Sequence, residues 1–223
     1  MGELFNLDNK FFQGLNKVID CICLSFMWLL LCIPLVTAGA ATTALYYTVN
    51  KVIRNNRSYI WKEFWHSFRV NFKQSTIVWV IVFLLYSLLA FDCYVMYQFA
   101  KQGASYGSLY IVFAVIMLFV TMWVIYLFPY LARFEIKTRL LLKNCALIAI
   151  GNIGKTILLL ILFVAAVLIC YVFPPALLLI PAVYMLLANY ILEKIFLKYM
   201  SPEDIEAEKE RNQEYINSVC CTY

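Results

Sequence analysis

The chain has 223 residues, of which 64% are apolar and only 14% are charged. A soluble globular domain carries about a quarter charged residues, so this composition excludes an ordinary water-soluble fold and favours an all-α, polytopic membrane protein. The formal net charge of +5 does not indicate nucleic-acid binding, because the basic residues fall in stretches that flank apolar segments.

Five apolar stretches predict membrane-spanning helices, because about 20 mostly apolar residues are needed to cross the hydrocarbon layer. The predicted spans cover residues 18–36, 75–98, 106–129, 154–173 and 174–196. Pro34 interrupts the first span near its end, and Pro174 and Pro175 join the last two in a tight hairpin. We therefore expect one integral membrane domain over residues 1–200 and an acidic cytoplasmic tail over residues 201–223.

Two amphipathic stretches near the N-terminus predict interfacial helices. The residues before the first span have apolar side chains near helical spacing, and they indicate a lead-in rather than a cleavable signal because the run continues into an integral core. Residues 40–54 place an apolar face beside Asn50, Lys51 and Arg54. That face consists of Leu45, Tyr46, Val49, Val52 and Ile53. Such a pattern is typical of a helix that lies in the membrane interface.

The stretch "SYIWKEFWHSFRVNFK", residues 58–73, combines an aromatic face with a basic stripe. The aromatic positions are Trp61, Phe64, Trp65, Phe68 and Phe72, and the basic positions are Lys62, His66, Arg69 and Lys73. One interpretation is a helix that lies flat on the anionic inner leaflet. The other is a docking helix for a cytoplasmic partner. The candidate surface therefore comprises Trp61, Lys62, Trp65, His66, Arg69 and Lys73.

Asp92 is the one acidic residue well inside an apolar segment, in "LLAFDCYVMYQF". An ionisable group within a span is a functional candidate by default. Asp92 lies about 25 Å beyond Ser75 along a helix, which places it near the outer interface. Tyr94, Tyr97 and Lys101 are expected to solvate it or pair with it there.

Two segments of similar order suggest an internal repeat. In each, a span closes near a proline, a basic amphipathic stretch follows, and Asn-x-x-Gln/Lys-Ser/Thr precedes the next span, at "NFKQST" and "NIGKT". A parallel repeat is one way in which transporter folds are built, and convergence of helix-end residues is the alternative interpretation. The Gly154-Lys155-Thr156 part of the second copy is not a nucleotide-binding loop, because Ala149 replaces its first glycine and apolar residues follow it.

No catalytic or metal-binding arrangement can be assembled from these motifs. His66 is the only histidine, and no Cys-x-x-Cys stands near a partner histidine or cysteine. Cys21, Cys23 and Cys93 lie near segment ends, where a disulfide is conceivable but not expected. We therefore expect no enzyme activity, no catalytic residues, no cofactor and no metal.

Lysine and arginine residues predict the orientation of the chain. Residues 50–74 hold six of them and residues 129–155 hold five, whereas the 99–105 connection holds one. The positive-inside rule places both basic stretches and the C-terminus in the cytoplasm. Five spans then put the N-terminus outside. Six spans, with residues 40–54 crossing back, would put it inside, and this alternative stays open because Lys10 and Lys17 fit poorly outside.

Nearly the whole chain resembles the YesL-type membrane proteins, a family of unknown function found largely in Gram-positive bacteria. The most specific motifs are "PLVTAGAATTALY" at 34–46 and "FRVNFKQ" at 68–74. The resemblance implies a multi-pass protein of the bacterial cytoplasmic membrane. Such proteins are often encoded beside carbohydrate ABC transporters, which implies a link to saccharide uptake. The family supplies no catalytic or binding residues to carry over.

Three functions are compatible with these features. The first is an accessory component of a carbohydrate (ABC-type) uptake system that contacts a transporter subunit through the basic stretches. The chain is not expected to be the permease, because it lacks the E-A-A…G loop that grips the ATPase. The second is a small stand-alone solute transporter, which the repeat would favour. The third is a membrane sensor or scaffold for a signalling partner.

Overall fold

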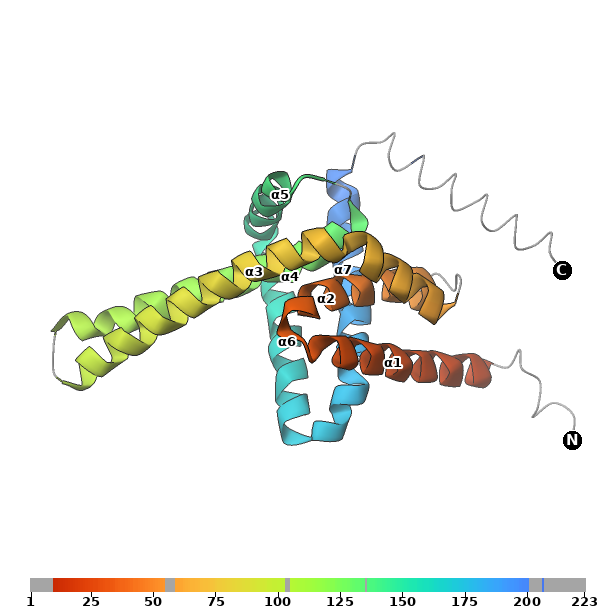
Figure 1. Cartoon of the computed structure of the whole chain (residues 1–223), viewed down its shortest axis with the longest axis horizontal. Coiled ribbons are helices and arrows are strands. Elements are labelled where there is room, and N and C mark those ends of the chain that lie inside the picture. Colours follow the sequence, from red (N-terminus) through yellow and green to blue (C-terminus); the bar gives the residue numbers. More distant parts are fainter. Residues whose placement is uncertain (1–9, 55–58, 103–104, 135, 201–205, 207–223) are drawn as a thin grey trace, which may run out of the picture.

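The computed structural model describes residues 10–54, 59–102, 105–134, 136–200 and 206, and these residues form an all-helical structure without a strand (Figure 1). The α-helices are α1 (Lys10–Cys32), α2 (Ala38–Thr48), α3 (Ile60–Lys101), α4 (Tyr110–Arg133), α5 (Thr138–Gly151), α6 (Ile153–Val172) and α7 (Ile180–Tyr199). Short 3-10 helices lie at η2 (Leu35–Thr37), η4 (Ser105–Leu109) and η5 (Pro174–Leu178), and a π-helical turn, η3 (Val49–Arg54), continues α2. The predicted fold class is confirmed.

Within the described residues, four helices are long and apolar enough to cross a membrane. They are Ile60–Lys101, Gly107–Arg133, Ile153–Val172 and Ile180–Tyr199, and they coincide with four of the five predicted spans. The chain is therefore an integral membrane protein. The remaining predicted span falls on α1, which begins at Lys10 and ends at Cys32, just before Pro34. The predicted lead-in and span are thus parts of one helix.

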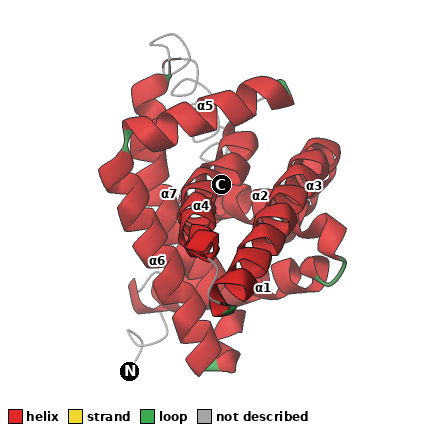
Figure 2. Cartoon of the chain, turned by 90° about the vertical axis from the view of Figure 1, so that its left-hand side faces the viewer, coloured by secondary structure: helices red, strands yellow, loops and turns green. Residues whose placement is uncertain are grey.

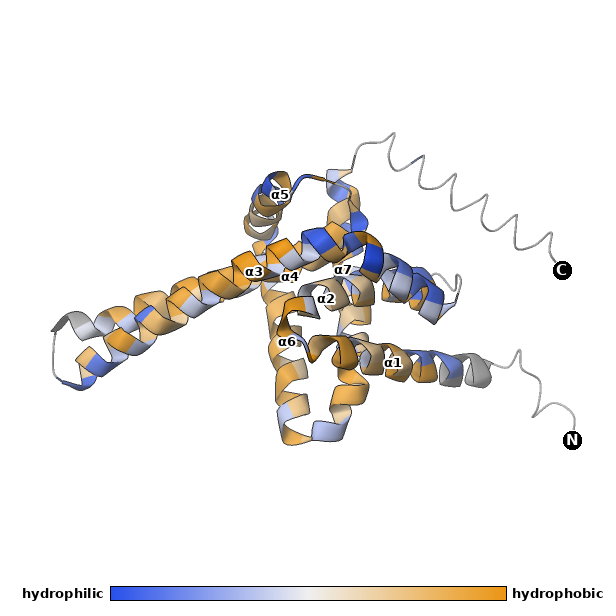
Figure 3. Ribbon diagram, viewed as in Figure 1, coloured by the Kyte–Doolittle hydropathy of each residue, from blue (hydrophilic) through white to orange (hydrophobic). Residues whose placement is uncertain are grey.

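Two helical hairpins project in different directions from a common base. In Figure 1, α3 and α4 extend to the left while α6 and α7 extend downward, and Figure 2 shows α3 and α4 nearly along their axes. The start of α6 and the ends of α4 and α7 come together near α5. Figure 3 shows hydrophilic residues gathered around this region and along the first part of α3. We call it the basic end, because the described residues of both basic stretches lie there.

The segment α2–η3 lies in the core, so the prediction of an interfacial helix at residues 40–54 is wrong. All five residues of its predicted apolar face are buried, with exposed fractions between 0% for Val49 and 8% for Val52. Small residues explain why the segment can enter the core. A Cβ atom added to Gly39 would lie 2.7 Å from the Cβ atom of Trp79 and 2.8 Å from the carbonyl oxygen of Ser75, so only glycine permits this approach.

Helices α1 and α2 run in opposite directions and are joined by the turn at η2. The beginning of α1 and the end of η3 therefore lie at the same end of the molecule as the beginning of α3 (Figure 1). This arrangement matches the alternative topology, in which the chain returns through residues 40–54. Whether the chain crosses five or six times stays a prediction.

Helix α3 joins two segments that the sequence analysis treated separately. Its 42 residues include both the aromatic and basic stretch and the predicted span 75–98. At 1.5 Å per residue the helix is about 63 Å long, roughly twice the thickness of the hydrocarbon layer. The first third of α3 is therefore joined to the span without a break in the helix. Phe64 and Phe68 in that first third are buried against a cluster that includes Leu24 and Leu45.

The two segments of the predicted repeat match locally and differ in continuity. Asn71 and Asn152 each donate a side-chain hydrogen bond to the carbonyl oxygen four residues earlier, at 3.1 Å in both cases. Ser75 and Thr156, four residues after each asparagine, are both buried. However, α3 runs through Asn71 without a break, whereas Asn152 separates α5 from α6. The repeat stays a prediction.

The Gly-Lys-Thr sequence lies in the first turns of α6 and follows a helix, α5, rather than a strand. Thr156 is buried there, and its hydroxyl lies 2.8 Å from that of Tyr126 on α4. This contact ties α6 to α4. The geometry is that of a helix packing contact and differs from the strand, loop and helix order of a phosphate-binding loop.

Candidate functional site

The predicted surface on α3 is exposed along its basic stripe. Lys62, His66, Arg69 and Lys73 all face away from the bundle. Trp61 and Trp65 are 62% and 37% exposed, so both indole rings accompany the stripe. The structure thus brings all six predicted surface residues together on one face of one helix.

The predicted aromatic face, in contrast, divides between surface and core. Phe64 is 0% and Phe68 9% exposed, whereas Trp61, Trp65 and Phe72 remain at the surface. The reason is that α1 and α2 cover only part of the helix circumference. Phe68 connects the two groups, because its ring packs edge-on against that of Trp65 at a centroid distance of 5.6 Å.

An ion pair fixes the orientation of this part of α3. The Nζ atom of Lys51 on η3 lies 2.8 Å from Oε2 of Glu63, and Glu63 is only 6% exposed. Lys51 lies outside the four candidate spans. Partial burial lowers its pKa, but hydrogen bonds with Glu63 and Tyr47 outweigh that effect and leave the pKa above its ordinary value. Lys51 therefore stays protonated at neutral pH and holds α3 against η3.

Asp92 does not belong to this surface. It is half-buried on α3, about 28 Å along the helix axis from Lys73 at 1.5 Å per residue. None of the ion pairs between residues of the described ranges involves its carboxylate. The expected partner Lys101 instead lies over the ring of Tyr97, with its Nζ atom 4.7 Å from the ring centroid.

A buried polar cluster surrounds Glu193 in the last turns of α7, and we did not predict it from the sequence. Glu193 is 4% exposed. Its Oε1 atom accepts hydrogen bonds from the hydroxyl of Tyr46 and from Nδ2 of Asn50, both at 3.1 Å. Its Oε2 atom lies 3.3 Å from a guanidinium nitrogen of Arg133 at the end of α4. We call these residues, with Arg54 and Asn189, the Glu193 cluster.

Arg54 binds to the neighbouring turn of α7. Its guanidinium group donates a hydrogen bond of 2.8 Å to Oδ1 of Asn189 and lies 5.3 Å from the ring centroid of Tyr190. Burying ionised groups is costly unless they are paired and hydrogen-bonded. The carboxylate of Glu193 meets this condition, because it receives groups from α2, η3 and α4, whereas Nδ2 of Asn189 is buried without a hydrogen-bond partner. The Glu193 cluster therefore links both hairpins to the core segment.

One signal in the sequence could have identified this cluster. Glu193 lies inside the span predicted at 174–196, among apolar residues, and a carboxylate within a span requires a partner. The partners could not be chosen from the sequence, because Tyr46 and Asn50 precede Glu193 by 147 and 143 residues.

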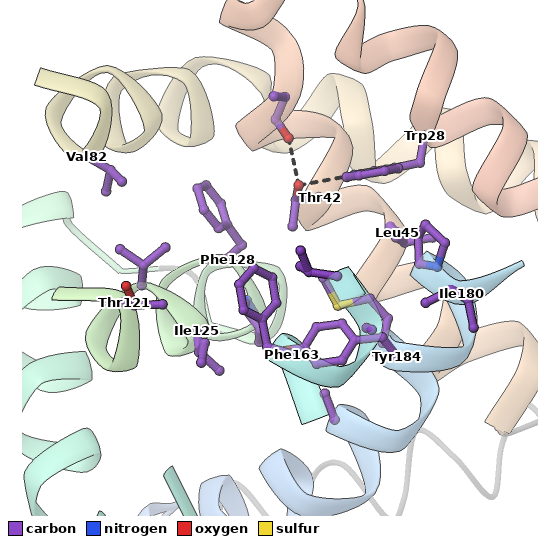
Figure 4. Close-up of a pocket in the computed structure, with 18 of the residues that line it drawn as sticks. Trp28, Thr42, Leu45, Val82, Thr121, Ile125, Phe128, Phe163, Ile180 and Tyr184 are labelled. Carbon is purple, nitrogen blue, oxygen red and sulfur yellow. Dashed lines mark hydrogen bonds between the residues drawn. The ribbon is translucent and has the colours of Figure 1, made fainter. Parts of the chain in front are cut away.

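An apolar groove of about 770 Å³ lies between the two hairpins and the core segment (Figure 4). Figure 4 shows Phe128 of α4, Phe163 of α6 and Tyr184 of α7 around the same space. Its wall also includes Leu45 and Leu192, whose chain neighbours Tyr46 and Glu193 belong to the Glu193 cluster. The groove therefore ends beside the cluster, but no charged residue lines it.

The described part of the chain contains no group of three or more histidine, cysteine, aspartate or glutamate side chains that could hold a metal ion. Its six cysteines, which include Cys21, Cys23 and Cys93, are free thiols. The disulfide that we considered at these positions is therefore not present. The predicted acidic tail lies outside the described residues, apart from Glu206.

Comparison with known protein families gives one match. The model of a family described as "Protein of unknown function, DUF624" matches residues 21–93. This region runs from α1 through the core segment and along most of α3, and it includes the predicted surface and Asp92. No curated protein and no solved structure matches the chain. The chain is thus similar, over this region, to an uncharacterised family.

Proposed function

We propose that this integral membrane protein is a non-enzymatic accessory subunit that works through contact at the cytoplasmic surface of the membrane. The observation that carries this proposal is the exposed stripe of Lys62, His66, Arg69 and Lys73 on α3. The opposite face of the same helix is locked by buried aromatic residues and by the pair of Lys51 and Glu63. A rigid support with an exposed basic and aromatic surface suits a docking site, because its side chains need little reorganisation on binding.

The burial of Phe64 and Phe68 favours a protein partner over the lipid surface. A helix can place both an aromatic and a basic face on the inner leaflet only when it lies nearly parallel to the membrane. Two residues of the aromatic face, Phe64 and Phe68, are instead buried in the protein core, so the helix has only part of an apolar face with which to enter the leaflet. We therefore propose that the stripe contacts an acidic surface of a partner.

A carbohydrate importer of the ABC type is the partner that the resemblance to YesL-type proteins implies, and we retain it as the proposed partner. The apolar groove supports an accessory role over a saccharide carrier. A sugar in the groove would leave most of its hydroxyl groups without hydrogen-bond partners, at a cost of about 1–3 kcal/mol for each buried group.

The test is a pull-down of the tagged full chain from native membranes in mild detergent, with mass spectrometry of the proteins that accompany it. We expect an importer subunit to accompany the unaltered chain and to be lost in the double variant K62E/R69E. The control is R139E/K143E, which reverses two exposed charges on α5 and should retain the partner. Equal recovery in both variants, or loss of membrane insertion in K62E/R69E, would contradict the proposal.

A further inference from the structure

We propose that the apolar groove between the two hairpins binds an acyl chain of a membrane lipid. This site is separate from the docking surface on α3. The proposal rests on three properties of the groove, namely its polar content, its access and its size.

Four of the polar side chains that line the groove are paired with one another. The indole nitrogen of Trp28 donates a hydrogen bond of 3.2 Å to the hydroxyl of Thr42. The hydroxyls of Tyr86 and Thr121 lie 2.7 Å apart. Because these groups bond to one another and no charged residue lines the groove, a ligand gains little from polar contacts there. The groove therefore selects for an apolar chain.

The groove opens between exposed apolar side chains. Phe83 of α3, Val167 of α6 and Leu177 of η5 line it and are also 49%, 51% and 39% exposed. Phe83 and Val167 belong to helices that are long and apolar enough to span a membrane, so their exposed surfaces suit contact with acyl chains. Lipid is the apolar molecule that the membrane itself supplies to such a surface.

The size of the groove fits a chain better than a protein element. Its volume of about 770 Å³ lies within the range of roughly 300–1,000 Å³ that is typical of small-molecule sites. Six helices contribute side chains to its wall, so the space is concave on several sides. They are α1, α2, α3, α4, α6 and α7. A flexible acyl chain can enter such a space, whereas a helix about 10 Å across requires an open face.

Tryptophan fluorescence can distinguish a lipid in the groove from lipid around the protein. Trp79 lines the groove, whereas Trp123 lies on the other side of α4, beside a hollow of about 290 Å³. Both side chains are half-buried. Two full-length variants would retain only one of these tryptophans, with phenylalanine at the other positions. The probe is phosphatidylglycerol with brominated acyl chains, added in small amounts to protein in detergent.

We expect saturable quenching of Trp79 and weak, non-saturable quenching of Trp123. Equal quenching of the two residues would mean ordinary contact with surrounding lipid and would overturn the proposal. A dimer that excludes the brominated lipid from Trp79, seen by native mass spectrometry, would also overturn it, because the groove would then be covered by a second copy.

Two neighbouring alanines on α6 provide a matched pair of variants. Ala166 lines the groove, while Ala165 does not line it and is exposed. A166F should weaken lipid binding by about tenfold, which corresponds to about 1.4 kcal/mol, and A165F should leave it unchanged. Thermal unfolding of both variants would check that each is folded. Unchanged lipid binding in folded A166F would contradict the proposal. The pull-down of a protein partner is independent of this result, so the two proposals can fail separately.

Discussion

The core segment α2–η3 and the first part of α3 have similar sequence patterns and opposite environments. Each combines an apolar or aromatic face with two or more basic residues, and we expected both to lie at the membrane surface. In η3, Lys51 and Arg54 turn inward and bind Glu63 and Asn189 on other helices. In α3, Lys62 and Arg69 remain exposed.

The difference shows that an amphipathic pattern does not identify the environment of its polar face. A basic side chain enters a protein interior when a carboxylate or amide is positioned to receive it, and otherwise remains in water. Glu63 and Glu193 provide such positions beside η3. The polar face of η3 is therefore structural, whereas that of α3 is available for a partner.

The strongest test of this contrast is the removal of the carboxylate at the centre of the Glu193 cluster. E193A should lower the free energy of unfolding by about 3–5 kcal/mol, because it leaves buried polar and charged groups without their acceptor. The measurement is chaotrope-induced unfolding in detergent micelles. Y46F, which removes only one donor to Glu193, should cost less, about 1 kcal/mol. If E193A lowered the free energy of unfolding by less than Y46F does, the cluster would not stabilise the core segment.

Packing around the core segment provides the next test. G39A should destabilise the protein by about 1–3 kcal/mol, since the added methyl group meets Trp79 and the backbone of Ser75 within 3 Å. G154A is the control, because a Cβ atom there has no neighbouring atom within 4 Å. It should be neutral or stabilising by about 0.5–1 kcal/mol, as expected for alanine in a helix. Thermal unfolding of both variants would decide whether α2 is packed as closely as the structure indicates.

The smallest expected effects compare one lysine from each region. K51A should lower the free energy of unfolding by about 1–2 kcal/mol, because it removes a partner of the buried carboxylate of Glu63. K62A should change it by less than about 0.5 kcal/mol, as is usual for a surface residue. The two variants would be unfolded under the same conditions. Equal effects would remove the distinction between a structural and an exposed basic face.

The helical class and most of the helices could be predicted because their signals are local. Pro34 ends α1, the apolar runs correspond to α3, α4, α6 and α7, and the exposed basic stripe on α3 follows from its helical spacing. The position of α2–η3 could not be predicted in this way. Its burial depends on Gly39 fitting against α3 and on acceptors supplied by α3 and α7.

The amino-acid sequence was sufficient to establish a polytopic helical membrane protein, since length and hydropathy act over short distances along the chain. The tertiary structure alone determined that two hairpins project in different directions and that an apolar groove lies between them. It also determined that Glu193 accepts a hydrogen bond from the hydroxyl of Tyr46, which lies 147 residues earlier in the sequence. These features depend on which helix faces meet. That choice is made by side-chain packing and by the pairing of buried polar groups between distant segments.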